Sequence, residues 1–141
     1  MEYIWETRKT LSVPANTISL GFRIDAPPAG RVTRLVVKQL GTSNLTNFSV
    51  RLFSLPVVAL VPNGQPPSDV PEDNAAITPT FTANAGSAAV YMSDGKGYCY
   101  RNMFSGKYTK PDRAVYLKLT LSAQQAVQTD WLVTLVVVAE S

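Results

Sequence analysis

Basic and aromatic side chains, which can bind ligands, lie close together in the sequence between Asp94 and Arg113. This segment reads DGKGYCYRNMFSGKYTKPDR, and its basic side chains exceed its carboxylates by 3, which equals the net charge of the whole chain. Basic groups interleaved with aromatic rings bind single-stranded nucleic acid by phosphate pairing and base stacking. They also bind sugars on a flat aromatic platform, or an acidic protein surface on which Tyr and Arg act as anchors. The ordinary structural alternative is that Tyr98 and Tyr100, two residues apart, simply share one face of a strand.

Among these ligands a protein partner is expected before a glycan. Nucleic acid is expected least, because the net charge of +3 is weak and no RNA-binding motif such as the RNP sequence is present.

Catalysis is not expected from this sequence. The chain contains no His and one Cys, so its many Ser and Thr residues lack the usual base that activates a nucleophile. Cys99 cannot form an internal disulfide. It lies between Tyr98 and Tyr100 in an expected strand, and we expect a buried, inert thiol there. We predict no catalytic residue.

A metal or cofactor site is not expected either. Asp69, Glu72 and Asp73 cluster in the sequence DVPED and could touch a calcium ion, but they lack the ligand spacing of an EF-hand loop. We expect these residues to form a solvated acidic stretch instead. The DGKG sequence has glycines without the following residues of a phosphate-binding loop.

The exterior is unusually poor in charge. Charged residues make up 16% of the chain, whereas a typical soluble domain has about 25%. Small neutral groups supply the polarity instead, and the mean hydropathy is +0.02. Depletion of charge is typical of surfaces that other protein covers. The alternative is a monomer with a surface rich in Ser and Thr.

Apolar and polar residues alternate with period 2 along most of the chain, as in ISLGFRID and RAVYLKLTLS. This alternation predicts half-buried strands. We expect about eight, near residues 2–11, 17–24, 31–40, 48–55, 88–93, 98–103, 114–121 and 130–139. Regular short strands separated by turns predict one all-β domain over residues 1–141, an antiparallel, jelly-roll-like β-sandwich. The turn sequence Asp94-Gly95, continued to Gly97, favours a hairpin.

Two strands suggest how the domain meets its surroundings. The sequence WLVTLVVVA near the C-terminus is apolar on both faces apart from Thr134, so either the domain covers both faces or one face meets a partner. The charges of the N-terminal strand suit a sheet edge. Exposed Tyr3 and Trp5 would make that edge an intersubunit contact.

A Pro-rich arm at about residues 56–87 interrupts the strand pattern. Six of the ten prolines lie between Pro56 and Pro79. Proline removes the amide donor that a central strand needs, and a loop this long is usually functional or disordered. We expect the arm to pack on a neighbouring chain through its apolar entrance. The alternatives are that it folds back over its own sandwich or binds a ligand.

With these features the chain resembles the small β-sandwich virion proteins of tailed bacteriophages, particularly capsid decoration or cement proteins. The resemblance rests on the compact size, the scarcity of Cys and His, the Ser/Thr-rich composition, the Pro-rich arm and the strand sequences TRLVVKQL, FSVRLFSL, AVYLKLTL and DWLVTLVVV. It implies a homo-oligomer, with a trimer favoured, that clamps neighbouring major-capsid subunits on the outer shell. No catalytic residues carry over.

The sequence therefore predicts a non-enzymatic structural protein of the virion, located at the capsid surface. We expect synthesis in the host cytoplasm without a signal peptide, because MEYIWETRKT is acidic and aromatic, and no membrane partner. The alternative function is a carbohydrate-binding or receptor-binding module of a fibre or tail. The expected partner contacts are Tyr3, Trp5, Val57, Val58, Leu60, Tyr98, Tyr100, Arg101, Lys107, Tyr108, Lys110 and Arg113.

Overall fold

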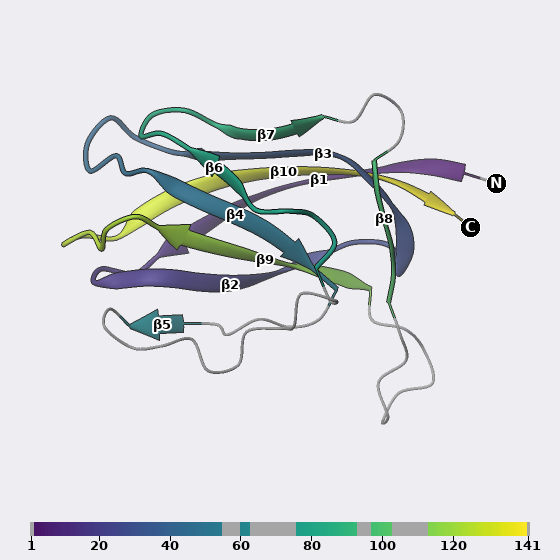
Figure 1. Ribbon diagram of the computed structural model, residues 1–141, viewed down its shortest axis with the longest axis horizontal. Coiled ribbons are helices and arrows are strands. Elements are labelled where there is room, and N and C mark those ends of the chain that lie inside the picture. The colour runs from purple at the N-terminus through teal and green to yellow at the C-terminus, as the bar shows by residue number, and fades with distance from the viewer. Residues whose placement is uncertain (1, 55–59, 63–75, 93–96, 103–112, 141) are drawn as a thin grey trace.

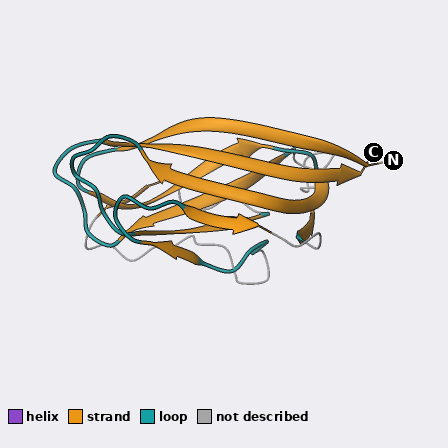
Figure 2. Ribbon diagram, turned by 90° about the horizontal axis from the view of Figure 1, so that it is seen from above, coloured by secondary structure: helices purple, strands orange, loops and turns teal. Residues whose placement is uncertain are grey.

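The computed structural model is an antiparallel β-sandwich of two sheets (Figures 1 and 2), and it describes residues 2–54, 60–62, 76–92, 97–102 and 113–140. No helix that could span a membrane occurs in these ranges. The strands are β1 (Glu2–Val13), β2 (Thr17–Asp25), β3 (Ala29–Gln39), β4 (Phe48–Phe53), β5 (Leu60–Pro62), β6 (Phe81–Ala83), β7 (Ala89–Met92), β8 (Tyr98–Arg101), β9 (Ala114–Leu121) and β10 (Thr129–Glu140).

The strand order is that of a jelly roll. Sheet A has the order β1-β10-β3-β7, with β8 also paired to β3, and sheet B has the order β5-β2-β9-β4-β6. Strands β1 to β4 alternate between the two sheets, and so do β6, β7, β9 and β10. Such repeated crossing between two antiparallel sheets defines a jelly roll, so the expected fold class is confirmed. Because β1 pairs with β10, Glu2 lies opposite Glu140, and both chain ends meet at one end of sheet A (Figure 1).

All eight expected strands are present, each with ends within two residues of the expected ones. Two strands, β5 and β6, add to the roughly eight expected. Each has three residues, which is too short for an alternating pattern to stand out.

The hairpin expected at Asp94-Gly95 is wrong. Strands β7 and β8 both pair antiparallel with β3, so they run in the same direction, one after the other, along one neighbour. Residues 93–96 lie outside the described residues. Gly97 has a φ of +70°, and a Cβ there would lie 2.5 Å from the Cγ atom of Arg31, so this position requires glycine.

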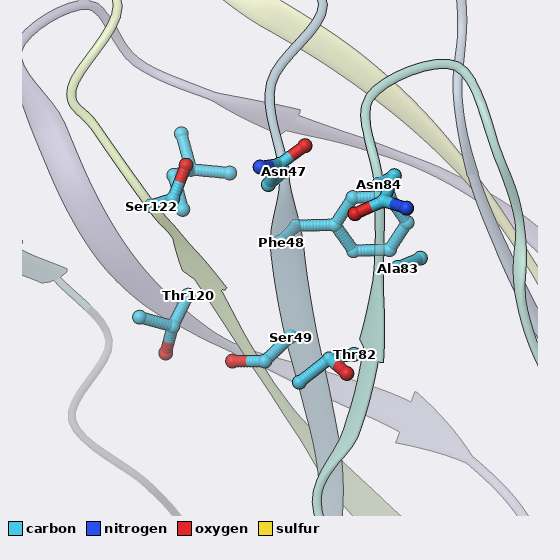
Figure 3. A pocket seen from close by; sticks show the side chains of 9 residues that line it. Asn47, Phe48, Ser49, Thr82, Ala83, Asn84, Thr120 and Ser122 are labelled. Carbon is cyan, nitrogen blue, oxygen red and sulfur yellow. The ribbon is translucent and has the colours of Figure 1, made fainter.

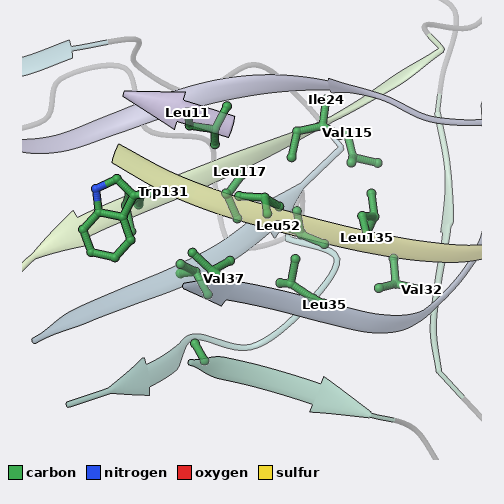
Figure 4. Close-up of a cluster of buried hydrophobic side chains, with 14 of the residues drawn as sticks. Leu11, Ile24, Val32, Leu35, Val37, Leu52, Val115, Leu117, Trp131 and Leu135 are labelled. Atoms are coloured by element: carbon green, nitrogen blue, oxygen red, sulfur yellow. The ribbon is translucent and has the colours of Figure 1, made fainter. Parts of the chain in front are cut away.

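The core lies between the sheets, where inward-facing residues of both meet (Figure 4). The rings of Trp131 and Phe48 pack edge to face across the gap with centroids 4.7 Å apart. The Trp131 indole Nε1 donates to the hydroxyl of Thr129 at 3.0 Å, so its polar group is satisfied although the side chain is fully buried.

The described parts of the Pro-rich arm lie on the chain's own sheet B. Strand β5 pairs with β2 at one edge, and β6 pairs with β4 at the opposite edge. The Ile77 amide donates to the carbonyl of Leu52 at 2.8 Å. For residues 60–62 and 76–83, the structure shows the alternative in which the arm folds back on its own sandwich, because their backbone groups complete the edges of sheet B. Residues 63–75 lie outside the described residues.

Candidate functional site

The outward side of sheet A carries an apolar surface at its centre. Inward-facing Trp131, Val133 and Leu135 of β10 are buried, whereas outward-facing Leu132, Val136 and Val138 are half-buried. Figure 2 shows sheet A as one outer layer of the sandwich, with no described strand beyond it. Among the described residues, no strand covers the outward side of WLVTLVVVA. We call Ile4, Val36, Val90, Leu132, Val136 and Val138 the outer apolar face.

Two members of the outer apolar face are strongly exposed. Ile4 on the edge strand β1 is 73% exposed, and Val90 on β7 is 46% exposed. The strand register places Ile4 beside Val138 and Val90 beside Val36. The expectation that the N-terminal strand forms a sheet edge is confirmed. The apolar side chains thus extend across neighbouring strands rather than standing singly.

Charges of opposite sign flank this face. One row of the register contains Glu6 of β1, Val136 of β10 and Arg34 of β3, in that order. Glu6 and Arg34 are both exposed. Glu6 also forms a surface ion pair with Arg8 at 3.5 Å. In this row the acidic Glu6 therefore stands on the edge strand and the basic Arg34 stands two strands away, with the valine between them.

A hollow of about 400 Å³ lies at the end of sheet A where the chain ends meet. Its lining includes Glu2, Val138, Arg31, Cys99 and Arg101. Cys99 is exposed, so the expectation of a buried thiol is wrong. The reason is the alternation of β8, in which Tyr100 points inward and its neighbour must point outward.

The outward side of sheet B has a different chemistry. The register aligns Ser19, Thr120, Ser49 and Thr82 in one row across four strands. The hydroxyls of Ser19 and Thr120 lie 3.3 Å apart and share a hydrogen bond. A row of hydroxyl groups thus crosses the outward side of sheet B.

An open hollow of about 430 Å³ adjoins this hydroxyl row (Figure 3). Its lining residues are Asn47, Phe48, Ser49, Thr82, Ala83, Asn84, Thr120, Leu121 and Ser122. The Asn47 side-chain oxygen accepts a hydrogen bond from the Ala85 amide at 2.7 Å. Phe48 is only 3% exposed, so its ring belongs to the core and gives no platform for a sugar. The lining offers neutral hydroxyl and amide groups.

Two cations face outward on sheet B beside the hydroxyl row. Arg51 and Lys118 are direct cross-strand partners. Burial, together with the charge of Arg51, lowers the pKa of Lys118. The Arg51 guanidinium donates to the carbonyl of Thr78 at 2.9 Å. Like charges in directly opposed positions repel each other, so this pair is unfavourable.

Tyr98 and Tyr100 point to the interior, as their two-residue spacing allows. Tyr100 is 8% exposed, and its hydroxyl donates to the carbonyl of Pro27 at 2.7 Å. Burial, with a smaller contribution from Tyr3, raises the pKa of Tyr100. Tyr98 packs against Tyr91 with ring centroids 4.4 Å apart, in a cluster that also includes Phe81 of the other sheet. These two tyrosines hold the sheets together in this structure.

The other expected contacts are scattered. Tyr3 is 40% exposed, and Trp5 is half-buried with its Nε1 donating to the carbonyl of Asp25 at 3.3 Å. Arg101 and Arg113 are exposed. Val57, Val58, Lys107, Tyr108 and Lys110 lie outside the described residues, and Leu60 is described through its backbone in β5.

The sequence reasoning missed the outer apolar face as a set of residues. WLVTLVVVA contained the necessary signal. Every second side chain of a strand faces away from the core, and in this strand those residues, apart from Thr134, are apolar as well. The register that adds Ile4, Glu6 and Arg34 to the same surface could not be obtained from one strand alone.

Comparisons with known proteins assign no family to the chain. No family model and no curated protein matches it. Among solved structures, a chain of the infectious bursal disease virus Gx strain matches all of this chain with 11% identity and a TM-score of 0.45, and this chain spans 32% of it. The acid-stable capsid structure of Helicobacter pylori bacteriophage KHP30 matches with 9% identity and a TM-score of 0.39, covering 100% of this chain and 95% of the other.

A third match is the 60-mer BFDV capsid protein, with 9% identity, a TM-score of 0.43, and coverage of 98% of this chain and 92% of the other. Similarities at this level do not assign a function. Within the described ranges there is also no group of three or more His, Cys, Asp or Glu residues that could hold a metal ion.

Proposed function

We propose that this chain is a non-enzymatic structural protein that assembles through protein–protein contacts, as a capsid decoration protein of a virus particle does. The observation that carries the proposal is the outer apolar face of sheet A. A contiguous apolar surface with polar surroundings is typical of a protein interaction site. Depletion of charge at its centre, with charges at the rim, is the arrangement found in protein interfaces.

The fold is compatible with this role. Jelly rolls occur in viral capsid domains and also in lectins, so the function must be argued from the surface and not from the fold. A surface shell offers many copies of each weak contact, and their combined effect retains the protein even where single contacts are modest.

Further parts of the proposal rest on the sequence. They are a homo-oligomer, with the trimer that the resemblance implies, and a major-capsid partner at the virion surface. We also retain Lys107, Tyr108 and Lys110 as a basic contact, and residues 63–75 of the arm as a contact with a neighbour. Removal of residues 63–75 should leave the sandwich folded and weaken association.

A matched pair of lysine substitutions tests the proposal. Val136→Lys places a charge on the central strand of sheet A, and Thr120→Lys places one at a half-buried, outward position on the central strand of sheet B. We expect Val136→Lys to reduce the mass of the assembled protein in light scattering over a concentration series. Thr120→Lys should leave that mass unchanged. A wild-type chain that remains monomeric at the highest concentration would contradict the proposal.

A second candidate function is the binding of a neutral glycan. It is supported by the hollow on sheet B, whose hydroxyl and amide groups suit a polyhydroxylated ligand. The test is a glycan array with the wild type and Asn84→Ala. Binding that Asn84→Ala removes would support this function, and an array without any bound glycan would reject it.

A further inference from the structure

The charges around the outer apolar face are arranged asymmetrically. On β1 the outward charged residues are Glu2, Glu6 and Arg8, with a net charge of −1, whereas on β3 they are Arg31, Arg34 and Lys38, with a net charge of +3. Strand β10 separates the two groups and contributes Asp130 near one end, followed by Leu132, Thr134, Val136 and Val138. A surface that is acidic on one side and basic on the other can be complementary to itself.

We propose that the partner of this face is a second copy of the same chain, docked face to face about a two-fold axis that runs along β10. The inference rests on the proposed function, because it names the partner of the same surface. An isologous contact uses one patch on both copies, so each pair of residues occurs twice. Two sheets that pack face to face keep their strand directions within about 30° of each other.

This axis brings opposite charges together. Rotation about β10 exchanges the two sides of the sheet and keeps each position along the strand, so β1 of one copy lies over β3 of the other. Glu6, Val136 and Arg34 belong to one register row. Glu6 of each copy therefore faces Arg34 of the other copy, and Val136 faces its own counterpart at the axis.

The other two-fold axis in the plane of the face is unfavourable. An axis perpendicular to the strands would place each strand over its own counterpart. The basic residues of β3 would then face the basic residues of the second β3. Like charges that meet across an interface cost several kcal/mol, so the three basic residues of β3 disfavour this second axis.

The size of the contact is sufficient for a specific dimer. Strand β10 has 12 residues. At about 3.4 Å per residue and about 4.8 Å between strands, β1, β10 and β3 offer a footprint of roughly 570 Å² per copy. The total of roughly 1,100 Å² exceeds the ~1,000 Å² expected of a biological interface. Docking would also cover Ile4, whose side chain is 73% exposed in the single chain.

A charge-swap experiment tests the arrangement. Glu6→Lys and Arg34→Glu are made singly and together, and the dimer dissociation constant is measured by sedimentation velocity. We expect each single substitution to raise the dissociation constant by about tenfold or more, because like charges then meet at two places. The double variant should return to within about threefold of the wild type, since both contacts are again between opposite charges.

The matched control is a second charge swap on the other sheet. Arg23 and Asp25 form an exposed ion pair on β2, so Arg23→Glu with Asp25→Lys changes the same charges away from the proposed contact. It should leave the dissociation constant unchanged. Melting temperatures of all variants verify that the exposed substitutions leave the fold intact.

Several outcomes would overturn the arrangement. An unchanged dissociation constant for Arg34→Glu would indicate another contact, such as edge pairing of β1 with a second β1, and would reject the proposal. A double variant as weak as the single variants would reject it too, as would a trimer without dimers. These results leave the proposed function intact if Val136→Lys still prevents assembly. A wild-type monomer at every concentration would overturn both.

Discussion

The two outward sides of the sandwich differ although both cover the same core. On sheet A the central strand β10 presents Leu132, Val136 and Val138, whereas on sheet B the central strand β9 presents Tyr116, Lys118 and Thr120. A row of hydroxyls that includes Thr120 and Ser49 crosses sheet B. In both sheets successive side chains point alternately inward and outward, and the inward ones are buried. The difference therefore does not arise from folding, which needs only the inner side. It agrees with the proposal that sheet A is the side that meets protein.

The largest expected effect separates the inner from the outer side of sheet A. Leu135→Ala should lower the free energy of unfolding by about 2–5 kcal/mol, because the side chain is fully buried and leaves a cavity. Leu132→Ala, the same change on the other side of β10, should cost about 1 kcal/mol or less, since this residue keeps contact with water. Urea unfolding of both variants measures the difference. Equal losses would show that the outer side of sheet A is covered within the chain.

A second prediction concerns the buried hydrogen bond from the Tyr100 hydroxyl to the carbonyl of Pro27. Tyr100→Phe should lower the free energy of unfolding by about 0.5–1.5 kcal/mol at about pH 8, because the hydrogen bond is lost. The pKa of Tyr100 is raised above its ordinary value of 10.0, so the unfolded chain ionises first as the pH rises. The contribution of the hydroxyl is therefore complete below about pH 10 and decreases above it.

Thermal unfolding between about pH 8 and about pH 11 checks this dependence. The wild type should lose more stability than Tyr100→Phe over that range. Parallel losses in both proteins would contradict the assignment to Tyr100.

A third prediction makes the two outward sides more alike. Val136→Thr gives sheet A the chemistry of sheet B, and Thr120→Val does the reverse. We expect Val136→Thr to weaken association by about threefold to tenfold and to change unfolding by about 0.5 kcal/mol or less. Thr120→Val should cost about 0.5–1.5 kcal/mol through the lost bond to Ser19 and leave association unchanged. Sedimentation measures association, and chemical unfolding measures the free energy of unfolding. If both variants changed association equally, the proposed difference between sheets A and B would be contradicted.

The smallest expected effect is on sheet B. Lys118→Gln removes the repulsion from Arg51, which contributes to the lowered pKa of Lys118. We expect a gain of about 0.2–1 kcal/mol in the free energy of unfolding at low salt. The gain should decrease at about 1 M salt, where charges are screened. A loss of stability at low salt would show that Lys118 has a favourable contact instead.

The fold could be predicted from the sequence because burial on one side imposes alternation. ISLGFRID and RAVYLKLTLS gave strands at the correct positions with the correct residues inward, and the charges of the N-terminal strand identified an edge. The pairing of strands could not be predicted. Strands β7 and β8 lie end to end along β3, and neighbours in sequence such as β9 and β10 belong to different sheets.

The candidate site was predicted in part. The apolar character of both faces of WLVTLVVVA left a partner contact as one of two alternatives, but the expected contacts were placed on aromatic, basic and arm residues elsewhere. Tyr100 proved to be buried. Tyr98 and Tyr100 are two residues apart on β8, so both side chains point to the same, inward face. Glu6 and Arg34 lie in one row only because of the register of three strands. A single sequence contains no record of that register.

The pairing of β1 with β10 also has a consequence for synthesis of the protein. The ladder partner of β1 comprises residues 129–140, so β1 emerges from the ribosome more than one hundred residues before it can pair. Contacts between such distant segments are formed slowly. Until then a 12-residue strand with free amide and carbonyl groups is available to other nascent chains. The charged side chains Glu6, Arg8 and Lys9 of this strand would keep it soluble during that interval.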